Sequence, residues 1–187
     1  MTFEEALASI EAKFPILSKT EFRGETTLVV EPEKIVEVCA HAKSLGFDML
    51  IDLSSVDNFG QEPRFEVVYE LYSLEGNYSL RLKTTVSEDN LEIDSVVSVW
   101  ETANWHEREV YDMMGIRFRN HPDLRRILMW EGYPYYPLRK DFPLAGKPSE
   151  VPGVAFTKAA PLEGGPFVTV PSTKGSRERE PRSRRVE

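Results

Sequence analysis

Three side chains near the middle of this chain are of the types that proton transfer uses: Glu107, Glu109 and His121. Carboxylates and imidazoles are common general acids and bases, so Glu107 and Glu109 form a candidate acid–base pair. Residues two apart on a helix point in different directions, however, and such carboxylates do not easily share a substrate. His121 precedes Pro122 in a loop, where a hydrogen-bonded structural histidine is more common than a proton carrier. The spacing therefore gives little support to an acid–base site.

The position of Glu107 favours a buried ion pair over catalysis. Intervals of three, four, three and four residues place on one stripe of a helix Trp100, Ala103, Glu107, Val110 and Met114. Gly115 is a suitable residue to end that helix. A carboxylate within an apolar stripe needs a partner, and we expect a cation from Arg125, Arg126 or Arg139. On the neighbouring face, Arg108 and Asp112 are spaced to pair with each other.

The basic residues after this helix favour contact with another protein over anion binding. Arg125-Arg126 and Arg139-Lys140 alternate with large apolar side chains: Leu124, Ile127, Leu138 and Phe142. Arginine together with aromatic residues is typical of protein interfaces. We therefore predict that this segment binds protein.

Patterns for most other sites are missing from the sequence. The chain has one cysteine, Cys39, and no paired spacing among His41, His106 and His121, which argues against a metal or an iron–sulfur cluster. Gly164-Gly165 lacks the flanking strand and helix of a dinucleotide site, and phosphate-loop and nucleophile-elbow patterns are also missing. The net charge of −8 argues against nucleic acid as a partner.

The sequence also lacks the pattern of a membrane span. No apolar run approaches the roughly 18 residues of a membrane helix, and the acidic N-terminus does not begin like a signal peptide. We therefore expect a chain that is soluble or held at a membrane by other proteins.

Elements that would position the central residues are predicted from periodicity. Thr2 and Glu5 have the spacing of a capping box before a helix over residues 3–13. A strand is expected over 26–30, a helix from Pro32 to Gly46, a strand over 47–53 and a loop over 54–61. Two strands over 64–74 and 78–86 form a hairpin across Glu75-Gly76-Asn77, and a short strand is expected over 116–118. The order predicts a two-layer α+β domain whose mixed or antiparallel sheet has about four strands.

The second half of the chain is irregular, because ten of the thirteen prolines lie at or after Pro122. This part still carries many large apolar side chains, which must be buried against something. We therefore divide the chain into an α+β domain over 1–118, an extended partner-binding arm over 119–171, and a charged, flexible tail over 172–187.

Residues in the helix and the arm together form a specific motif. It comprises Glu107-Arg108-Glu109, Asp112, Gly115, Phe118, His121-Pro122, Leu124, Arg126-Ile127-Leu128 and Pro137-Leu138-Arg139-Lys140-Asp141-Phe142. This motif closely resembles that of the 30-kDa subunit family, the C-type subunit, of respiratory NADH:quinone oxidoreductase, or complex I. The order of elements is similar to that family over roughly residues 1–145, whereas the basic tail departs from it.

The resemblance implies a non-catalytic structural and assembly subunit of the peripheral arm, which supports NADH-to-quinone electron transfer coupled to proton translocation. It implies that FMN, iron–sulfur clusters and quinone are held by the complex and not by this chain. The implied partners are chiefly the D-type subunit, of the 49-kDa type, which helps form the quinone pocket, and nearby iron–sulfur subunits. The implied location is the cytoplasmic face of the bacterial inner membrane, through the complex alone. Alternatives are a related complex that uses ferredoxin, coenzyme F420 or hydrogen, an adaptor outside respiration, and an autonomous small enzyme.

Overall fold

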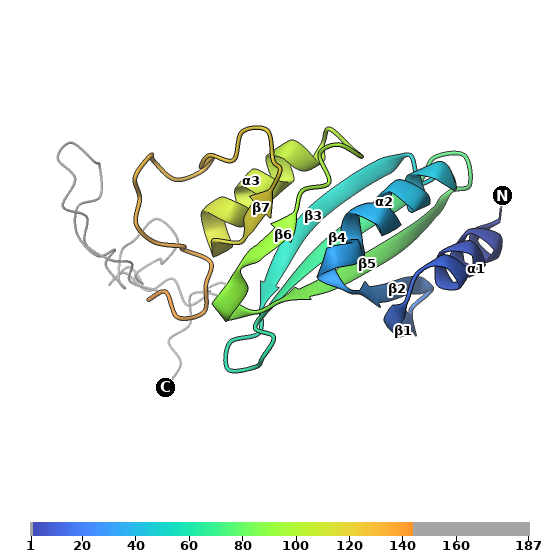
Figure 1. Cartoon of the computed structure of the whole chain (residues 1–187), viewed down its shortest axis with the longest axis horizontal. Helices are drawn as coiled ribbons and strands as arrows, with labels where there is room; N and C mark the ends of the chain where they lie inside the picture. The colour runs from blue at the N-terminus through green and yellow to red at the C-terminus, as the bar shows by residue number, and fades with distance from the viewer. Residues whose placement is uncertain (1, 144–187) are drawn as a thin grey trace, which may run out of the picture. The chain divides into compact units, whose positions relative to one another are not determined.

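Alternating apolar residues along β4 (Phe65–Ser73) and β5 (Tyr78–Val86) build the centre of a five-stranded sheet in the computed structural model, which describes residues 2–143. The strand order is β1-β2-β5-β4-β3, with β1 (Ile16–Phe22), β2 (Glu25–Val30) and β3 (Met49–Asp57) completing the sheet (Figure 1). Only β2 and β5 run parallel within it. The α+β class and the mixed sheet are confirmed.

Three α-helices cover one face of this sheet: α1 (Phe3–Lys13), α2 (Ile35–Ser44) and α3 (Ala103–Met114). α1 begins at the predicted capping box, in which the Thr2 hydroxyl accepts from the Glu5 N–H and the Glu5 carboxylate accepts from the Thr2 N–H. A short 3-10 helix, η1 (Pro32–Lys34), precedes α2. Their apolar side chains meet those of the sheet in one core.

The opposite face of the sheet carries paired charges. Arg81 bonds to both Glu70 and Glu25, and the Lys83 ammonium lies 3.2 Å from the Glu66 carboxylate. Cross-strand pairs of opposite charge stabilise a half-exposed sheet face modestly. This face therefore needs no covering layer.

Two strands differ from the sequence prediction. β1 was not expected, because its residues are exposed after Ile16 and its sequence does not alternate. It pairs with β2 across Arg23-Gly24, whose φ angles of 53° and 80° suit a two-residue hairpin turn. The prediction of a loop over 54–61 is wrong in its first part, since β3 continues to Asp57 along the whole length of β4.

α3 leads into a second, smaller sheet. The helix ends at Gly115, which has φ +81°, and the chain returns through β7 (Arg117–Arg119), which pairs parallel with β6 (Glu92–Asp94). A second 3-10 helix, η2 (Glu88–Asn90), precedes β6. This pairing brings the residues after β7 back alongside α3 (Figure 1).

The residues after β7 contain no helix or strand between 120 and 143. Residues 2–140 belong to one compact unit, and a second unit begins at Asp141. The rest of the predicted arm, from 144 to 171, and the predicted tail over 172–187 lie outside the described residues.

Candidate functional site

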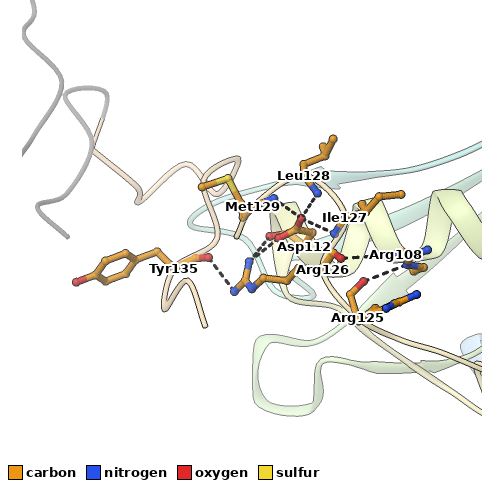
Figure 2. Close-up of polar contacts among 8 residues, drawn as sticks. All are labelled: Arg108, Asp112, Arg125, Arg126, Ile127, Leu128, Met129 and Tyr135. Atoms are coloured by element: carbon orange, nitrogen blue, oxygen red, sulfur yellow. Dashed lines mark hydrogen bonds and ion pairs between the residues drawn. The ribbon is translucent and has the colours of Figure 1, made fainter. Parts of the chain in front are cut away.

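The last turns of α3 carry an anchor for the chain that follows. The Asp112 side chain is fully buried, and its Oδ2 accepts the N–H groups of three consecutive residues at 3.0, 2.7 and 2.8 Å: Ile127, Leu128 and Met129 (Figure 2). Its Oδ1 accepts from the Arg126 guanidinium at 2.6 Å. One carboxylate thus fixes the path of four consecutive residues.

The charge state of Asp112 follows from these bonds. Burial by itself raises the pKa of Asp112, but the three N–H groups and Arg126 together hold the pKa below its ordinary value. The carboxylate is therefore ionised at neutral pH. Hydrogen bonds to an ionised acceptor are stronger than neutral ones, so the anchor is stable.

The expected pair between Arg108 and Asp112 does not form. Arg108 instead donates through Nε to the Arg125 carbonyl at 3.1 Å and through a terminal nitrogen to the Arg126 carbonyl at 3.5 Å (Figure 2). The spacing on α3 permits the pair, but the segment after β7 passes between the two side chains and supplies partners to each. Arg108 and Asp112 therefore hold the same segment from two sides.

Arg126 and Arg139 extend the anchoring. Arg126 also donates to the carbonyls of Asp112 and Tyr135, at 3.0 and 3.1 Å. The Arg139 Nε donates to the Met114 carbonyl at 2.7 Å, with its guanidinium 5.2 Å from the Phe65 ring and 4.6 Å from the Tyr136 ring. Both arginines thus satisfy backbone groups of an irregular segment.

A second carboxylate anchor lies on β3. The Asp57 side chain is fully buried and forms a two-bond ion pair with Arg64, at 2.8 and 2.9 Å. Its Oδ2 also accepts the Lys140 N–H at 2.7 Å. Arg64 lowers the pKa of Asp57, although burial opposes it. Sequence reasoning missed this anchor, because 83 residues separate Asp57 from Lys140 and no local pattern links them.

Gly115 is fitted to this arrangement in two ways. Its φ of +81° is unfavourable for other residues, and a Cβ at this position would lie 2.7 Å from both the Tyr136 ring and the Arg139 guanidinium. The glycine at the end of α3 therefore lets the segment after β7 approach the helix.

Glu107 is buried as predicted, with no exposed surface, but its partner is different from the expected one. Its Oε1 accepts the Val96 N–H at 2.7 Å, and its Oε2 lies 4.0 Å from the Nε2 of His121. The prediction of an arginine partner is wrong, because α3 turns Glu107 toward the core and turns Asp112 toward the arginines. Burial raises the pKa of Glu107 to about 7, against the opposing effect of Ser95 and the Val96 N–H.

His121 is a structural histidine in this arrangement. Its Nδ1 accepts the Asp123 N–H at 3.0 Å, which assigns the ring proton to Nε2, 3.2 Å from the Asn104 carbonyl. Burial lowers the pKa of His121. The imidazole is therefore neutral at pH 7, and it joins the residues after β7 to the start of α3.

The remaining motif residues lie outside this buried network. Glu109 and Pro122 are exposed, Arg125 forms an exposed pair with Asp123 at 2.9 Å, and Leu138 is 56% exposed. Asp141 and Phe142 belong to the second unit. The large apolar side chains Trp105 and Leu128 are also exposed, by 62% and 61%. The motif thus divides into residues that hold the segment and residues that it presents.

Two further properties concern residues 2–143 alone. They contain no group of three or more His, Cys, Asp or Glu side chains arranged to hold a metal ion. They also contain no helix that is both long and apolar enough to cross a membrane.

The fold and the site define a structural type of protein, an α+β domain whose most distinctive charged residues position an irregular segment of the same chain. The family model described as the 30 Kd subunit of respiratory-chain NADH dehydrogenase matches residues 28–148, and the chain belongs to this family. The function that follows is that of a structural subunit of NADH-quinone oxidoreductase, complex I.

Individual relatives agree with the family match. The C-type subunit of NADH-quinone oxidoreductase from Geobacter sulfurreducens is 50% identical over 149 residues, which cover 78% of this chain and 92% of the relative. The second C-type subunit of the Rhizobium meliloti enzyme is 52% identical over 126 residues, covering 66% of this chain and 69% of the relative.

Two solved structures share the fold. The trypsin-resistant fragment (1–134) of Nqo5 has a TM-score of 0.57 and 36% identity, covering 65% of this chain and 98% of the fragment. A chain of the archaeal membrane-bound sulfane sulfur reductase has a TM-score of 0.67 and 25% identity, covering 75% of this chain and 85% of that chain.

Membership in this family places the chain among the subunits of a membrane-bound complex that holds FMN, iron–sulfur clusters and quinone.

Proposed function

We propose that this protein joins the complex through α3 and the segment that begins at residue 119, and that its chief partner is the 49-kDa-type subunit, with the nearby iron–sulfur subunits beside it. The single observation that carries this proposal is the Asp112 anchor, which holds residues 126–129 in a fixed path. The anchored segment presents Leu128 and Leu138, and α3 presents Trp105. Exposed apolar side chains beside arginines are typical of the residues that contribute most to binding.

The proposed role is preorganisation. Electron transfer to a quinone requires subunits to keep fixed relative positions, and a prearranged binding segment loses less conformational entropy on association. In this proposal the motif residues hold and present the segment, none of them reacts, and the chain binds no FMN, cluster or quinone. The protein lies on the cytoplasmic face of the inner membrane and reaches the membrane only through its partners.

Truncation tests this proposal. A chain that ends at Phe118 keeps all five strands of the main sheet and all three α-helices, so we expect it to fold and yet to be missing from the complex purified from detergent-solubilised membranes. The full-length chain with the same tag is the positive control, and circular dichroism of the isolated fragment verifies folding. Incorporation of the fragment at the full-length level would refute the proposal.

A further inference from the structure

A cavity of about 600 Å³ opens beside α3, on the side where the anchored segment passes. Its wall comes from the helix and from the residues after β7: Arg108, Tyr111, Leu124, Arg125, Arg126, Met129, Glu131, Gly132 and Tyr133. Binding pockets in proteins commonly have volumes of roughly 300–1,000 Å³. The cavity is therefore large enough for one or more side chains of another polypeptide.

Arg108 is the distinctive charged group in this wall. Only 9% of the residue is exposed, and its guanidinium donates to two carbonyl oxygens and lies 5.1 Å from the Trp105 ring. Within the described part of the chain, no carboxylate oxygen forms an ion pair with it. The other two arginines of the wall have such partners, since Arg125 pairs with Asp123 and Arg126 with Asp112.

A buried charge without a counter-charge is unfavourable. Carbonyl groups satisfy two of the Arg108 donors, but they carry only partial charge and do not neutralise the guanidinium. The cavity gives an outside group access to this side chain. A carboxylate placed there would neutralise the guanidinium and accept its remaining N–H groups.

The rest of the wall favours a polypeptide over a free anion or a phosphate group. Glu131 adds a negative charge, which opposes an occupant with the two charges of a phosphate and favours one that also offers an N–H donor. A peptide that carries an aspartate or glutamate has both a carboxylate and backbone N–H groups. The apolar and aromatic part of the wall, which includes Tyr111, Met129 and Tyr133, suits the side chains next to that carboxylate.

We infer that this cavity is a receptor for an acidic side chain of a partner polypeptide, an aspartate or glutamate with apolar neighbours, which pairs with Arg108. The inference rests on the proposed function, because it assumes that this face of α3 is covered in the complex. It adds the chemistry of the partner segment and the residue that recognises it.

Matched substitutions test the ion pair in the assembled complex. The labelled complex carrying Arg108→Met is incubated with an excess of unlabelled wild-type chain, and the rate at which the labelled chain leaves is measured. Loss of one partner of a buried pair mainly speeds dissociation, and we expect a rate roughly 30-fold or more above wild type. Arg125→Met removes the same charge from an exposed side chain, and we expect a change of no more than about twofold.

A second variant covers the case in which Arg108→Met disturbs folding. Leu124→Trp fills part of the cavity without removing any of the anchoring bonds, and we expect it to speed dissociation as well. Dissociation rates of both Arg108→Met and Leu124→Trp equal to that of Arg125→Met would overturn the inference. If the chain ending at Phe118 is nevertheless missing from the complex, the proposed function survives and only the receptor cavity is refuted.

Crosslinking identifies the occupant. A photoreactive phenylalanine analogue replaces Leu124 in the native complex, and the joined peptides are sequenced by mass spectrometry. We expect a peptide of another chain with an aspartate or glutamate within about three residues of the crosslink, the reach of an extended segment across the cavity. Crosslinks confined to lipid, to this chain or to a partner segment without an acidic residue would contradict the inference.

Discussion

At the scale of single residues, the buried carboxylates of this protein have different roles because they have different partners. Asp112 and Asp57 accept several N–H donors and an arginine, and both have pKa values below the ordinary one. Glu107 accepts one backbone N–H and faces a neutral histidine, so burial dominates and raises its pKa to about 7. The first two residues anchor the segment after β7, whereas Glu107 makes stability depend on pH.

The pH dependence has a definite sign. Between the ordinary carboxyl pKa of 4.5 and about 7, the folded chain binds more protons at Glu107 than the unfolded chain does. Stability from this group is therefore greatest below pH 4.5 and is lost as the pH rises to about 7. Glu107→Gln removes this dependence. We expect its free energy of unfolding, relative to wild type, to rise by about 3 kcal/mol between pH 4.5 and pH 8.

Urea unfolding of the isolated chain at several pH values measures this difference. The lowered pKa of His121 gives a loss of stability as the pH falls through its ordinary value of 6.5, but both chains share it. It therefore cancels in the comparison. A difference between the two chains that stays constant across this pH range would show that Glu107 does not titrate near neutrality.

Gly115→Ala should be among the most damaging small substitutions in the chain. The added Cβ meets the Tyr136 ring and the Arg139 guanidinium at 2.7 Å, and the positive φ of this position adds backbone strain. We expect a loss of about 3 kcal/mol in the free energy of unfolding. Gly24→Ala is the control, since its φ is +80° with no atom near the new Cβ, and we expect it to cost about 1 kcal/mol. Equal losses would mean that Tyr136 and Arg139 yield to the methyl group.

At the scale of elements, periodicity predicted what local contacts determine. The stripe on α3 placed Glu107 in the core, and the capping box, the hairpin of β4 and β5 and the irregular segment were also predictable. Partners across the fold were not predictable, because the path of residues 119–140 depends on bonds such as the one between Asp57 and the Lys140 N–H. β1 lacks the alternation that marks a buried strand and forms because it pairs with β2.

The anchor on α3 should control the order of the segment that follows it. Asp112→Asn removes the charge and one acceptor oxygen, so the N–H groups of Ile127, Leu128 and Met129 lose most of their bonding. We expect these amides to exchange with deuterium at least roughly tenfold faster, while amides of β4 and β5 keep their protection. Asp123→Asn changes an exposed carboxylate in the same way and should leave these rates unchanged. Unchanged exchange in Asp112→Asn would mean that other contacts hold the segment.

At the scale of the whole molecule, the paired charges on the open face of the sheet and the exposed apolar groups near α3 suggest different surroundings in the complex. The anchored segment presents Leu128 at 61% exposure, although burying such a side chain is favourable by roughly 2 kcal/mol. Leu128→Asp changes only the outward side chain, because the anchoring bond uses the backbone N–H of this residue. We therefore expect the isolated chain to fold normally and its share in the purified complex to fall at least roughly tenfold. Leu74→Asp makes the same change at 63% exposure in the turn between β4 and β5, and it should assemble like wild type. Equal assembly of the two variants would contradict a partner that covers the anchored segment, and equal loss would extend the covered surface to that turn.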